Sequence, residues 1–316
     1  MKTSFLKAAG IVLAFALSLS TLSACSSPEE ELTENPEAPT EITVTDQSGR
    51  TVTLESLPEK IVSLAPSNTE ILFSLGLEEK IVGVSDYCDY PAAALEKPKI
   101  GGYSTTDVER IVAAEPDVIF ASDMHVAEIL PALEKLGQTV VVIDPRTLDE
   151  VLESFTLIGQ VTGTEQKAAE ITADMAARMK TITDKAAGLS EDQKPRVFYV
   201  MWHDPLMTVG GDTRICEMIE KAGGISLFNE TEGYPMISLE ALVDSNPQVI
   251  IAGTGMGEGA DAPFTFALTE ERLASSEART NNRIYEVNTD LTGRPSERII
   301  DGFEQIAKMI HPDLFE

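Results

Sequence analysis

The chain has 316 residues, of which 43% are hydrophobic, enough to form one large core or two medium-sized ones. Its 52 acidic side chains outnumber 24 Lys and Arg side chains, so the formal net charge is -28. A surface this acidic repels nucleic acids and anionic lipid headgroups, which excludes both as expected partners.

The first 24 residues have the features of a signal peptide. Lys2 and Lys7 precede the apolar stretch AAGIVLAFALSLSTL, which is too short and too rich in small residues for an ordinary transmembrane helix. The letters LSAC at 22–25 resemble the bacterial lipobox, in which cleavage leaves the Cys as the first residue and its thiol carries lipid. We therefore predict that Cys25 is lipidated. The alternative is an ordinary signal peptide that is cut near the same place.

Residues 25–40 are predicted to be a flexible tether. The run after Cys25 is polar, acidic and rich in Pro, so it cannot bury enough apolar surface to fold. Together with the lipidated Cys, such a tether would hold a folded domain at the outer face of the cell membrane. We expect the N-terminal lipid to be the only contact with the membrane.

Residues 41–146 are predicted to form a small α/β lobe that begins with a hairpin. The segment 41–55 alternates apolar and polar residues around the turn residues at 47–49. Short buried strands and helices then alternate, with Ser67 as the expected N-cap of the first helix. The expected strands are 60–66, 80–86, 117–122 and 139–144, and the expected helices are 67–77, 105–116 and 126–137.

Residues 147–190 are predicted to be helices that link two lobes. The segment 164–188 has no Pro or Gly before its end and is rich in Ala, Glu, Lys and Met. As a helix it would be about 37 Å long, enough to cross from one lobe to the other as a rigid spine. The alternative is a helix that packs within one lobe.

Residues 191–316 are predicted to form the second α/β lobe. Its expected strands are 195–202, 248–253 and 283–288, and its expected helices are 213–224, 238–247 and 296–312. Residues 239–254 repeat the pattern of residues 108–123 with a constant offset of 131. We therefore expect one helix–Pro–strand unit in each lobe, a pseudo-twofold relation between the lobes, and a ligand cleft between them.

The sequence lacks the residue patterns of common catalytic sites, so we do not expect an enzyme. It has no GxSxG, HExxH or GxxxxGK[ST] motif. Its three His residues (His125, His203 and His311) are scattered without metal-ligand spacing, so neither a metal site nor a cofactor is expected. Cys88 and Cys216 are expected to be separate thiols, although a disulfide that joins the two halves is the alternative.

Aromatic residues on predicted loops suggest a ligand site. Tyr87, Tyr103 and Tyr234 follow strands or precede helices, and Trp202 ends a strand. Such positions are where open α/β sheets place their ligands. Aromatic walls suit a large, flat and partly apolar ligand, although any one of these rings could equally belong to the core.

Several segments in this order resemble the substrate-binding proteins of the iron-siderophore and vitamin B12 ABC importers, most closely the cobalamin-binding members. These segments are IVSLAPSNTEILFSLGL, VGVSDYCDYP, IGGYST, VERIVAAEPDVIF, YPMISLEAL and NTDLTGRPSERI. The resemblance implies two α/β lobes and a solute-binding role. It covers about residues 58–312.

The resemblance also implies ligand contacts. Tyr87 matches a Tyr that lies against the corrin, and Tyr103 and Tyr234 stand where that family often has Trp. Asp290 and Arg294 match polar residues that reach the amide side chains of the corrin. Two further candidates are Pro66, at the loop edge of the cleft, and Trp202, which has no firm counterpart in the family.

The implied function is the capture of cobalamin or another corrinoid by a monomer, which delivers it to the permease dimer of an ABC importer with its ATPase. In this family the residues that match Glu109 and Glu240 meet basic residues of the membrane subunits. For either Glu alone, the simpler interpretation is stabilisation of its helix N-terminus by about 0.3–1 kcal/mol. A ferric siderophore or haem is the alternative ligand, and a lipoprotein enzyme is a more distant alternative.

Overall fold

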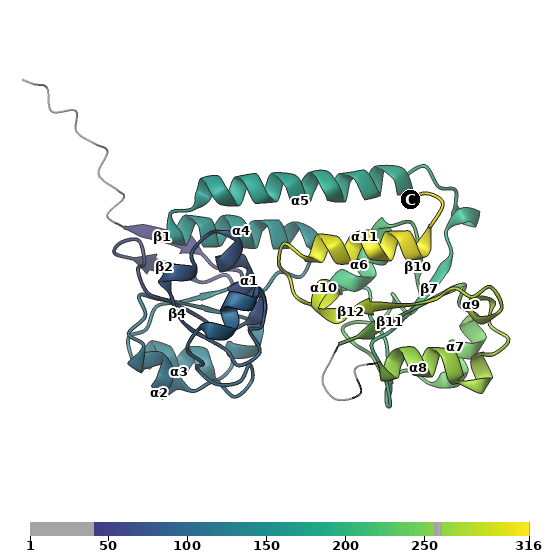
Figure 1. Cartoon of the computed structure of the whole chain (residues 1–316), viewed down its shortest axis with the longest axis horizontal. Coiled ribbons are helices and arrows are strands. Elements are labelled where there is room, and N and C mark those ends of the chain that lie inside the picture. Colours follow the sequence, from purple (N-terminus) through teal and green to yellow (C-terminus); the bar gives the residue numbers. More distant parts are fainter. Residues whose placement is uncertain (1–40, 256–258, 260, 316) are drawn as a thin grey trace, which may run out of the picture. The chain divides into compact units, whose positions relative to one another are not determined.

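A computed structural model describes residues 41–255, 259 and 261–315 (Figure 1). The predicted signal peptide, Cys25 and the predicted tether therefore lie outside the described residues. Residues 39–316 form one compact unit, so the predicted boundaries at 146 and 190 divide lobes within a unit and stay predictions. Among the helices that the structure describes, none is long and apolar enough to span a membrane.

The N-terminal lobe contains, within residues 61–142, a sheet of four parallel strands in the order β4-β3-β5-β6. The strands consist almost entirely of buried residues because helices cover both faces. One face packs against α2 and α3, and the other packs against α1 and a later helix, α4 (Leu148–Thr162). The strands are β3 (Ile61–Ser63), β4 (Ile81–Val84), β5 (Val118–Ala121) and β6 (Val140–Val142), and the helices are α1 (Pro66–Ser74), α2 (Val108–Ala113) and α3 (Ile129–Lys135).

The predicted hairpin is confirmed as an antiparallel pair that is fastened to the N-terminal lobe. Its strands are β1 (Ile42–Thr45) and β2 (Thr51–Leu54). The buried Asp46 carboxylate accepts hydrogen bonds from the Arg50 side chain at 3.1 Å and from the Val142 backbone N–H at 3.2 Å. The hairpin is thereby joined to the edge strand β6.

The C-terminal lobe has, in its described residues, a second sheet of four parallel strands in the order β10-β7-β11-β12. Side chains of β7 alternate between two apolar clusters, one under α6 and α11 and the other under α7 and α8. The strands are β7 (Arg196–Val200), β10 (Ile225–Ser226), β11 (Val249–Thr254) and β12 (Ile284–Asn288). The helices are α6 (Arg214–Lys221), α7 (Leu239–Ser245), α8 (Ala262–Thr269), α9 (Glu277–Thr280), α10 (Thr289–Gly293) and α11 (Ile299–Ile310).

Short elements complete the fold, and the sequence did not predict them. A two-stranded ribbon follows β7 and carries Trp202, and single turns of 3-10 helix occupy several loops. The ribbon consists of β8 (Trp202–His203) and β9 (Leu206–Met207), and the 3-10 turns are η1 (Glu78–Lys80), η2 (Ala92–Glu96), η3 (Asp123–His125), η4 (Glu191–Gln193) and η5 (Glu271–Leu273).

The repeated segment occupies the same place in both lobes. In each four-stranded sheet the strand that comes first in the sequence lies between the second and the third, and the repeat supplies the third strand, β5 or β11, with the helix before it. The equivalent helices begin at equivalent N-caps, because the Asp107 side chain accepts from the Arg110 N–H and the Ser238 side chain accepts from the Ala241 N–H. The predicted helix–Pro–strand repeat is therefore confirmed.

The same repeat also ends its helices in the same way. Glu115 and Asn246, again 131 residues apart, have φ values of 47° and 42° and stand directly before Pro116 and Pro247. A left-handed residue turns the chain away from the helix axis, and the following Pro cannot continue a helix. The repeat in sequence is thus a repeat of helix start, helix end and strand.

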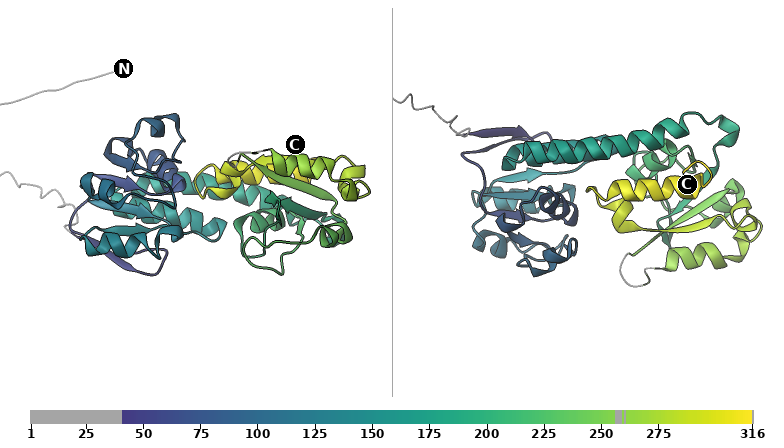
Figure 2. Two further views of the ribbon diagram at one scale, coloured as in Figure 1. Left: turned by 90° about the horizontal axis from the view of Figure 1, so that it is seen from below. Right: turned by 45° about the horizontal axis from the view of Figure 1, so that its top comes forward.

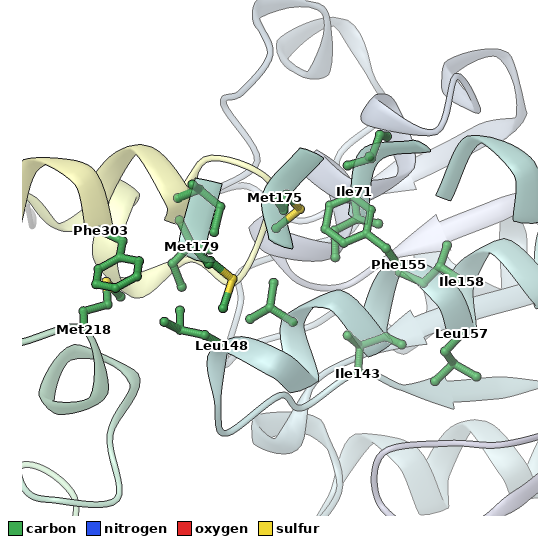
Figure 3. Packing of buried hydrophobic residues seen from close by; sticks show 14 of the residues in the cluster. Ile71, Ile143, Leu148, Phe155, Leu157, Ile158, Met175, Met179, Met218 and Phe303 are labelled. Atoms are coloured by element: carbon green, nitrogen blue, oxygen red, sulfur yellow. The ribbon is translucent and has the colours of Figure 1, made fainter. Parts of the chain in front are cut away.

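Helix α5 (Glu165–Ala186) runs along both lobes (Figure 1), as the predicted spine requires. Its 22 residues correspond to about 33 Å, slightly less than predicted because it ends at Ala186. It packs against α4 (Leu148–Thr162) and then against α6 and α11. Figure 3 shows Met175 near Ile71 of the N-terminal lobe and Phe155 of α4, while Phe303 and Met218 belong to the C-terminal lobe. The alternative of a helix confined to one lobe is wrong.

The predicted N-cap of α1 is wrong. The N-cap is Ala65, which makes no side-chain cap, and Pro66 follows at the first helical position, where its missing N–H costs nothing. Ser67 lies inside the helix and is buried. Glu70, three residues after Ser67, binds residues of the other lobe, as described below.

Candidate functional site

A pocket of about 390 Å³ lies where the loops of the two lobes meet. The N-terminal lobe contributes loops that follow its strands β3 and β4, at the carboxyl edge of the sheet, where open α/β sheets bind ligands. The C-terminal lobe contributes the end of α10 and the segment after it. The wall consists of Ala65, Pro66, Ser67, Tyr87, Tyr103 and Ser104 from one lobe and Gly293, Arg294 and Pro295 from the other.

Four predicted ligand residues share this wall: Pro66, Tyr87, Tyr103 and Arg294. Tyr87 is 63% exposed, so most of its ring is available to a ligand. Figure 2 shows the two lobes from two further directions, with α5 running past both. The structure therefore brings together side chains that are more than 200 residues apart in the sequence.

Tyr103 is held by a buried histidine. The His125 Nε2–H donates to the Tyr103 carbonyl at 2.9 Å, and its Nδ1 accepts from the Ser122 N–H at 3.1 Å. The Tyr103 hydroxyl lies 3.0 Å from the Ser122 hydroxyl, and its ring meets the imidazole edge-on at 5.3 Å. Burial lowers the pKa of His125 and raises the pKa of Tyr103. His125 is thus a neutral residue of the core that fixes Tyr103 at the pocket.

Tyr87 precedes a buried thiol that holds its loop. The Cys88 Sγ lies 3.1 Å from the Thr69 hydroxyl and 3.2 Å from the Ser85 hydroxyl, and Lys99 donates to the Cys88 carbonyl at 3.0 Å. Burial raises the pKa of the Cys88 thiol. Cys88 and Cys216 are separate buried thiols, so the predicted pair of free cysteines is confirmed and the disulfide alternative is wrong.

Arg294 lies in a group of three carboxylates. Its Nη1 donates to Asp89 at 2.6 Å and to Glu70 at 3.1 Å, and its Nη2 lies 2.9 Å from Asp290. Burial by itself lowers the pKa of Arg294, but these carboxylates together raise it above its ordinary value. In turn, the hydrogen bond from Arg294 lowers the pKa of Asp89. Asp290 therefore pairs with Arg294, and its carboxylate lies outside the pocket wall.

Glu70 is one residue of this site that sequence reasoning missed. Its side chain is 3% exposed, and both carboxylate oxygens are fully used. Arg298 binds it in a bidentate manner, from Nε at 3.0 Å and Nη2 at 2.5 Å, and the Ser296 hydroxyl donates at 2.5 Å. The Arg298 guanidinium also lies 3.8 Å from the ring centre of Tyr90. The spacing of Ser67 and Glu70 concealed this role because it resembles a capping box.

Arg214, also missed, joins the two lobes at the edge of the same pocket. It donates from Nη1 to the Pro145 carbonyl, at the exit of the N-terminal lobe, and from Nη2 to the Gly293 carbonyl at 3.2 Å. Burial lowers the pKa of Arg214. No motif in the sequence marks this residue, which stands in the first turn of α6.

Trp202 and Tyr234 lie on the C-terminal lobe outside the wall of this pocket. The Trp202 indole N–H donates to the Asp204 carbonyl at 2.9 Å, and Trp202 pairs across the ribbon with Met207. Met207 in turn bridges to Met236, which is 71% exposed and follows Tyr234 by two residues. Backbone pairing thus links Trp202, Met207 and Met236 on the second lobe, away from the pocket wall.

Glu109 and Glu240 occupy equivalent exposed positions. Each is in the first turn of its helix, α2 or α7, two residues after the repeated N-cap. The Glu240 carboxylate lies 3.3 Å from Arg272 on the surface, a pair that contributes little stability. Both carboxylates are thus accessible to a partner.

Residues 61–291 match the family model described as periplasmic binding protein, and the chain belongs to this family. It is 33% identical over 320 residues to the Bacillus subtilis protein named uncharacterized ABC transporter substrate-binding lipoprotein YvrC, covering 98% of this chain and 99% of that protein. It is 30% identical over 276 residues to a cobalamin-binding protein of Halobacterium salinarum, covering 85% of this chain and 74% of that one. It also superposes with a TM-score of 0.69 and 29% identity on the periplasmic vitamin B12 binding protein BtuF of Vibrio cholerae, covering 80% and 96%.

These likenesses confirm the predicted two-lobed α/β fold and the predicted family. The family comprises solute-binding proteins of ABC transporters rather than enzymes. The chain is therefore an extracytoplasmic substrate-binding protein that works with the permease and ATPase of an ABC importer. The prediction that it is not an enzyme follows from this membership.

Proposed function

We propose that this protein is a lipid-anchored receptor that binds a corrinoid and delivers it to an ABC importer. The observation that carries the proposal is the pocket wall in which Tyr87 and Tyr103 of one lobe face Arg294 of the other. Relatives that match most of the chain are named for cobalamin or vitamin B12. The chemistry of the wall fits such a ligand.

A corrin has broad, largely apolar faces and amide side chains at its edge. A tyrosine ring in contact with a face buries apolar area worth about 25 cal/mol per Å². Tyr87 offers such a ring because 63% of it is exposed, and Pro66 adds apolar surface beside it. The predicted partners on the opposite lobe are Trp202 and Tyr234, at the strand ends of the second sheet.

Amide groups would be bound by Arg294 in the wall and by Asp290 beside it. Arg294 can donate to an amide carbonyl, and Asp290 can accept from an amide N–H. The ion pair between them at 2.9 Å orients both groups at one rim. A ligand amide would therefore meet a donor and an acceptor that are already fixed.

Glu109 and Glu240 are proposed to dock the importer. They are exposed, they head equivalent helices, and the lobes repeat one topology. A dimeric permease with twofold symmetry presents the same basic surface twice, so two matched carboxylates suit it. Cys25, with its lipid, would keep the monomeric receptor at the outer face of the cell membrane, near that importer.

The direct test is a titration of residues 39–316 with cyanocobalamin, followed by calorimetry or by quenching of the single Trp. We expect saturable binding of one ligand per chain. Unchanged fluorescence and heat at micromolar cyanocobalamin, with tight binding of a ferric siderophore, would reject the corrinoid. The double variant Tyr87→Ala/Arg294→Ala is the matched control, because it removes one ring and one donor from the same wall.

Haem is the second candidate ligand, and one observation favours it. The Tyr87 phenol is mostly exposed at the pocket, where it could approach an iron atom as an axial ligand. The visible spectrum of the purified protein after addition of haemin separates the two ligands. A shift that disappears in Tyr87→Phe would assign haem and an axial Tyr87.

A further inference from the structure

The Glu70 contacts join the two lobes at a single buried carboxylate. All of its hydrogen-bond donors belong to the segment 294–298, more than 220 residues further along the chain. That segment includes two residues of the pocket wall, Arg294 and Pro295, and directly follows a third, Gly293. Through Glu70, the N-terminal lobe therefore holds in place the part of the pocket wall that the C-terminal lobe contributes.

The carboxylates of Glu70, Asp89 and Asp290 hold the Arg294 guanidinium in one position. Arg298 already satisfies Glu70 with two hydrogen bonds, so Arg294 is held by its single bond to Glu70 together with Asp89 and Asp290. Its side chain is 18% exposed, and that small exposed part faces the pocket. Without the Glu70 carboxylate, Arg298 would lose its ion pair, and Asp89 and Asp290 alone would offset the repulsion between Arg294 and Arg298 in a partly buried place.

Tyr90 extends the same junction on the N-terminal lobe. Its ring stacks on the Arg298 guanidinium at 3.8 Å, and its loop also carries Asp89 and the pocket residue Tyr87. Separating the lobes at this rim would break the Arg298–Tyr90 and Arg294–Asp89 contacts together with those of Glu70. The rim of the pocket is thus a pre-formed structure with parts from both lobes.

We propose that Glu70 is a positioning residue for ligand binding, which acts by holding Arg294 and the segment 293–298 in the pocket wall. This inference rests on the proposed function, because Arg294 is taken as a ligand contact. Glu70 would thus affect the affinity for the ligand although it does not belong to the pocket wall. Glu70 itself does not contact the ligand.

The test is Glu70→Gln, an isosteric change that removes the charge and keeps one acceptor. We expect the Kd for cyanocobalamin to rise about tenfold or more. Glu304→Gln is the matched control, because Glu304 also accepts from an arginine, Arg178 at 2.8 Å, but lies outside the pocket wall. That control should bind as the unchanged protein does. An unchanged Kd in a folded Glu70→Gln protein would overturn the proposal.

A double-variant cycle separates positioning from general stability. If Glu70 acts through Arg294, Glu70→Gln should add almost nothing to the loss of affinity caused by Arg294→Ala. Full additivity of the two losses would overturn the proposal. Should Glu70→Gln fail to fold, Arg298→Lys replaces it, because Lys keeps the charge and loses the bidentate contact, and it should weaken binding several-fold.

Amide hydrogen exchange provides a reading that needs no ligand. Glu70→Gln should speed exchange at least tenfold in both 86–90 and 293–298, and Glu304→Gln should not. Unchanged exchange in these segments would overturn the proposal. If the unchanged protein binds haemin or a ferric siderophore instead of cyanocobalamin, the same variants are titrated with that ligand. A failure of the corrinoid assignment is thereby distinguished from a failure of the Glu70 inference.

Discussion

The two lobes share a scaffold and differ in what they place at the pocket. Both have the strand order in which the first strand lies between the second and the third, and both carry the repeated helix–Pro–strand unit. The N-terminal lobe supplies aromatic residues that are held from within, Tyr103 by His125 and Tyr87 by the loop around Cys88. The C-terminal lobe supplies Arg294, which is held by carboxylates that include two from the opposite lobe.

This difference teaches that a repeated scaffold does not imply repeated sites. Helix caps and chain reversals recur at a fixed offset because they serve each lobe alone. The loops at the strand ends have diverged because they serve the ligand and the contact between lobes. Changes at equivalent positions can therefore test which features belong to both lobes.

The largest effect is expected where the lobes remain equivalent. The double variant Glu109→Ala/Glu240→Ala should abolish importer-dependent uptake of cyanocobalamin in cells and leave its Kd unchanged, because both carboxylates lie outside the pocket wall. Glu165→Ala is a suitable control, since Glu165 is also an exposed residue in the first turn of a helix. Normal uptake by the double variant would remove the docking assignment.

The next effect concerns the asymmetric rim. Arg294→Ala should raise the Kd for cyanocobalamin by roughly 10–100-fold, because a hydrogen bond to a charged group contributes about 1.5–3 kcal/mol. It should also lower the melting temperature, since the buried Glu70 loses a partner. Asp290→Ala, which removes a more exposed member of the group, should have a smaller effect on both. Equal affinity in Arg294→Ala and the unchanged protein would exclude Arg294 as a ligand contact.

A smaller effect compares the aromatic surfaces of the two lobes. Tyr87→Ala and Tyr234→Ala should each weaken binding by about five- to thirtyfold, because one face of a ring contributes roughly 1–2 kcal/mol. Similar losses measured by calorimetry would mean that the ligand touches both lobes. A loss in Tyr87→Ala alone would confine the ligand to the 390 Å³ pocket, away from Tyr234.

The smallest effect is a pH dependence that belongs to the N-terminal lobe. Burial lowers the pKa of His125 below its ordinary value of 6.5, so the unfolded chain binds a proton more readily than the folded one. The stabilisation is complete above pH 6.5 and decreases as the pH falls from there toward the folded pKa. Urea midpoints between pH 8 and pH 5 should fall less in His125→Gln than in the unchanged protein. Identical slopes would show that other groups cause the loss.

Much of the fold could be predicted because it depends on local pattern. Buried strands such as 117–122, helix ends before Pro116 and Pro247, and the uninterrupted helical composition of 164–188 are determined by residues close together in sequence. The short ribbon that carries Trp202 was missed because two-residue strands have no periodicity. Helix α8 was missed because Pro263 near its start resembles a loop residue.

The site could be predicted only in part. Pro66, Tyr87, Tyr103 and Arg294 were selected by family resemblance and their chemistry, and the fold brings them into one wall. Glu70 and Arg214 were missed because their partners are far away in the chain. A buried ion pair across two lobes leaves no mark in either local segment.

The Glu70 contacts have a consequence for how the exported chain matures. A polypeptide that leaves the cell with its N-terminus first presents residue 70 long before residues 294–298 arrive. Until they do, this glutamate on α1 lacks its hydrogen-bond donors, and α5 lacks the face of α11 against which it packs. Completion of the tertiary structure therefore waits for the last two dozen residues, and a nascent chain stalled before residue 294 should remain sensitive to proteases even though its first sheet is complete.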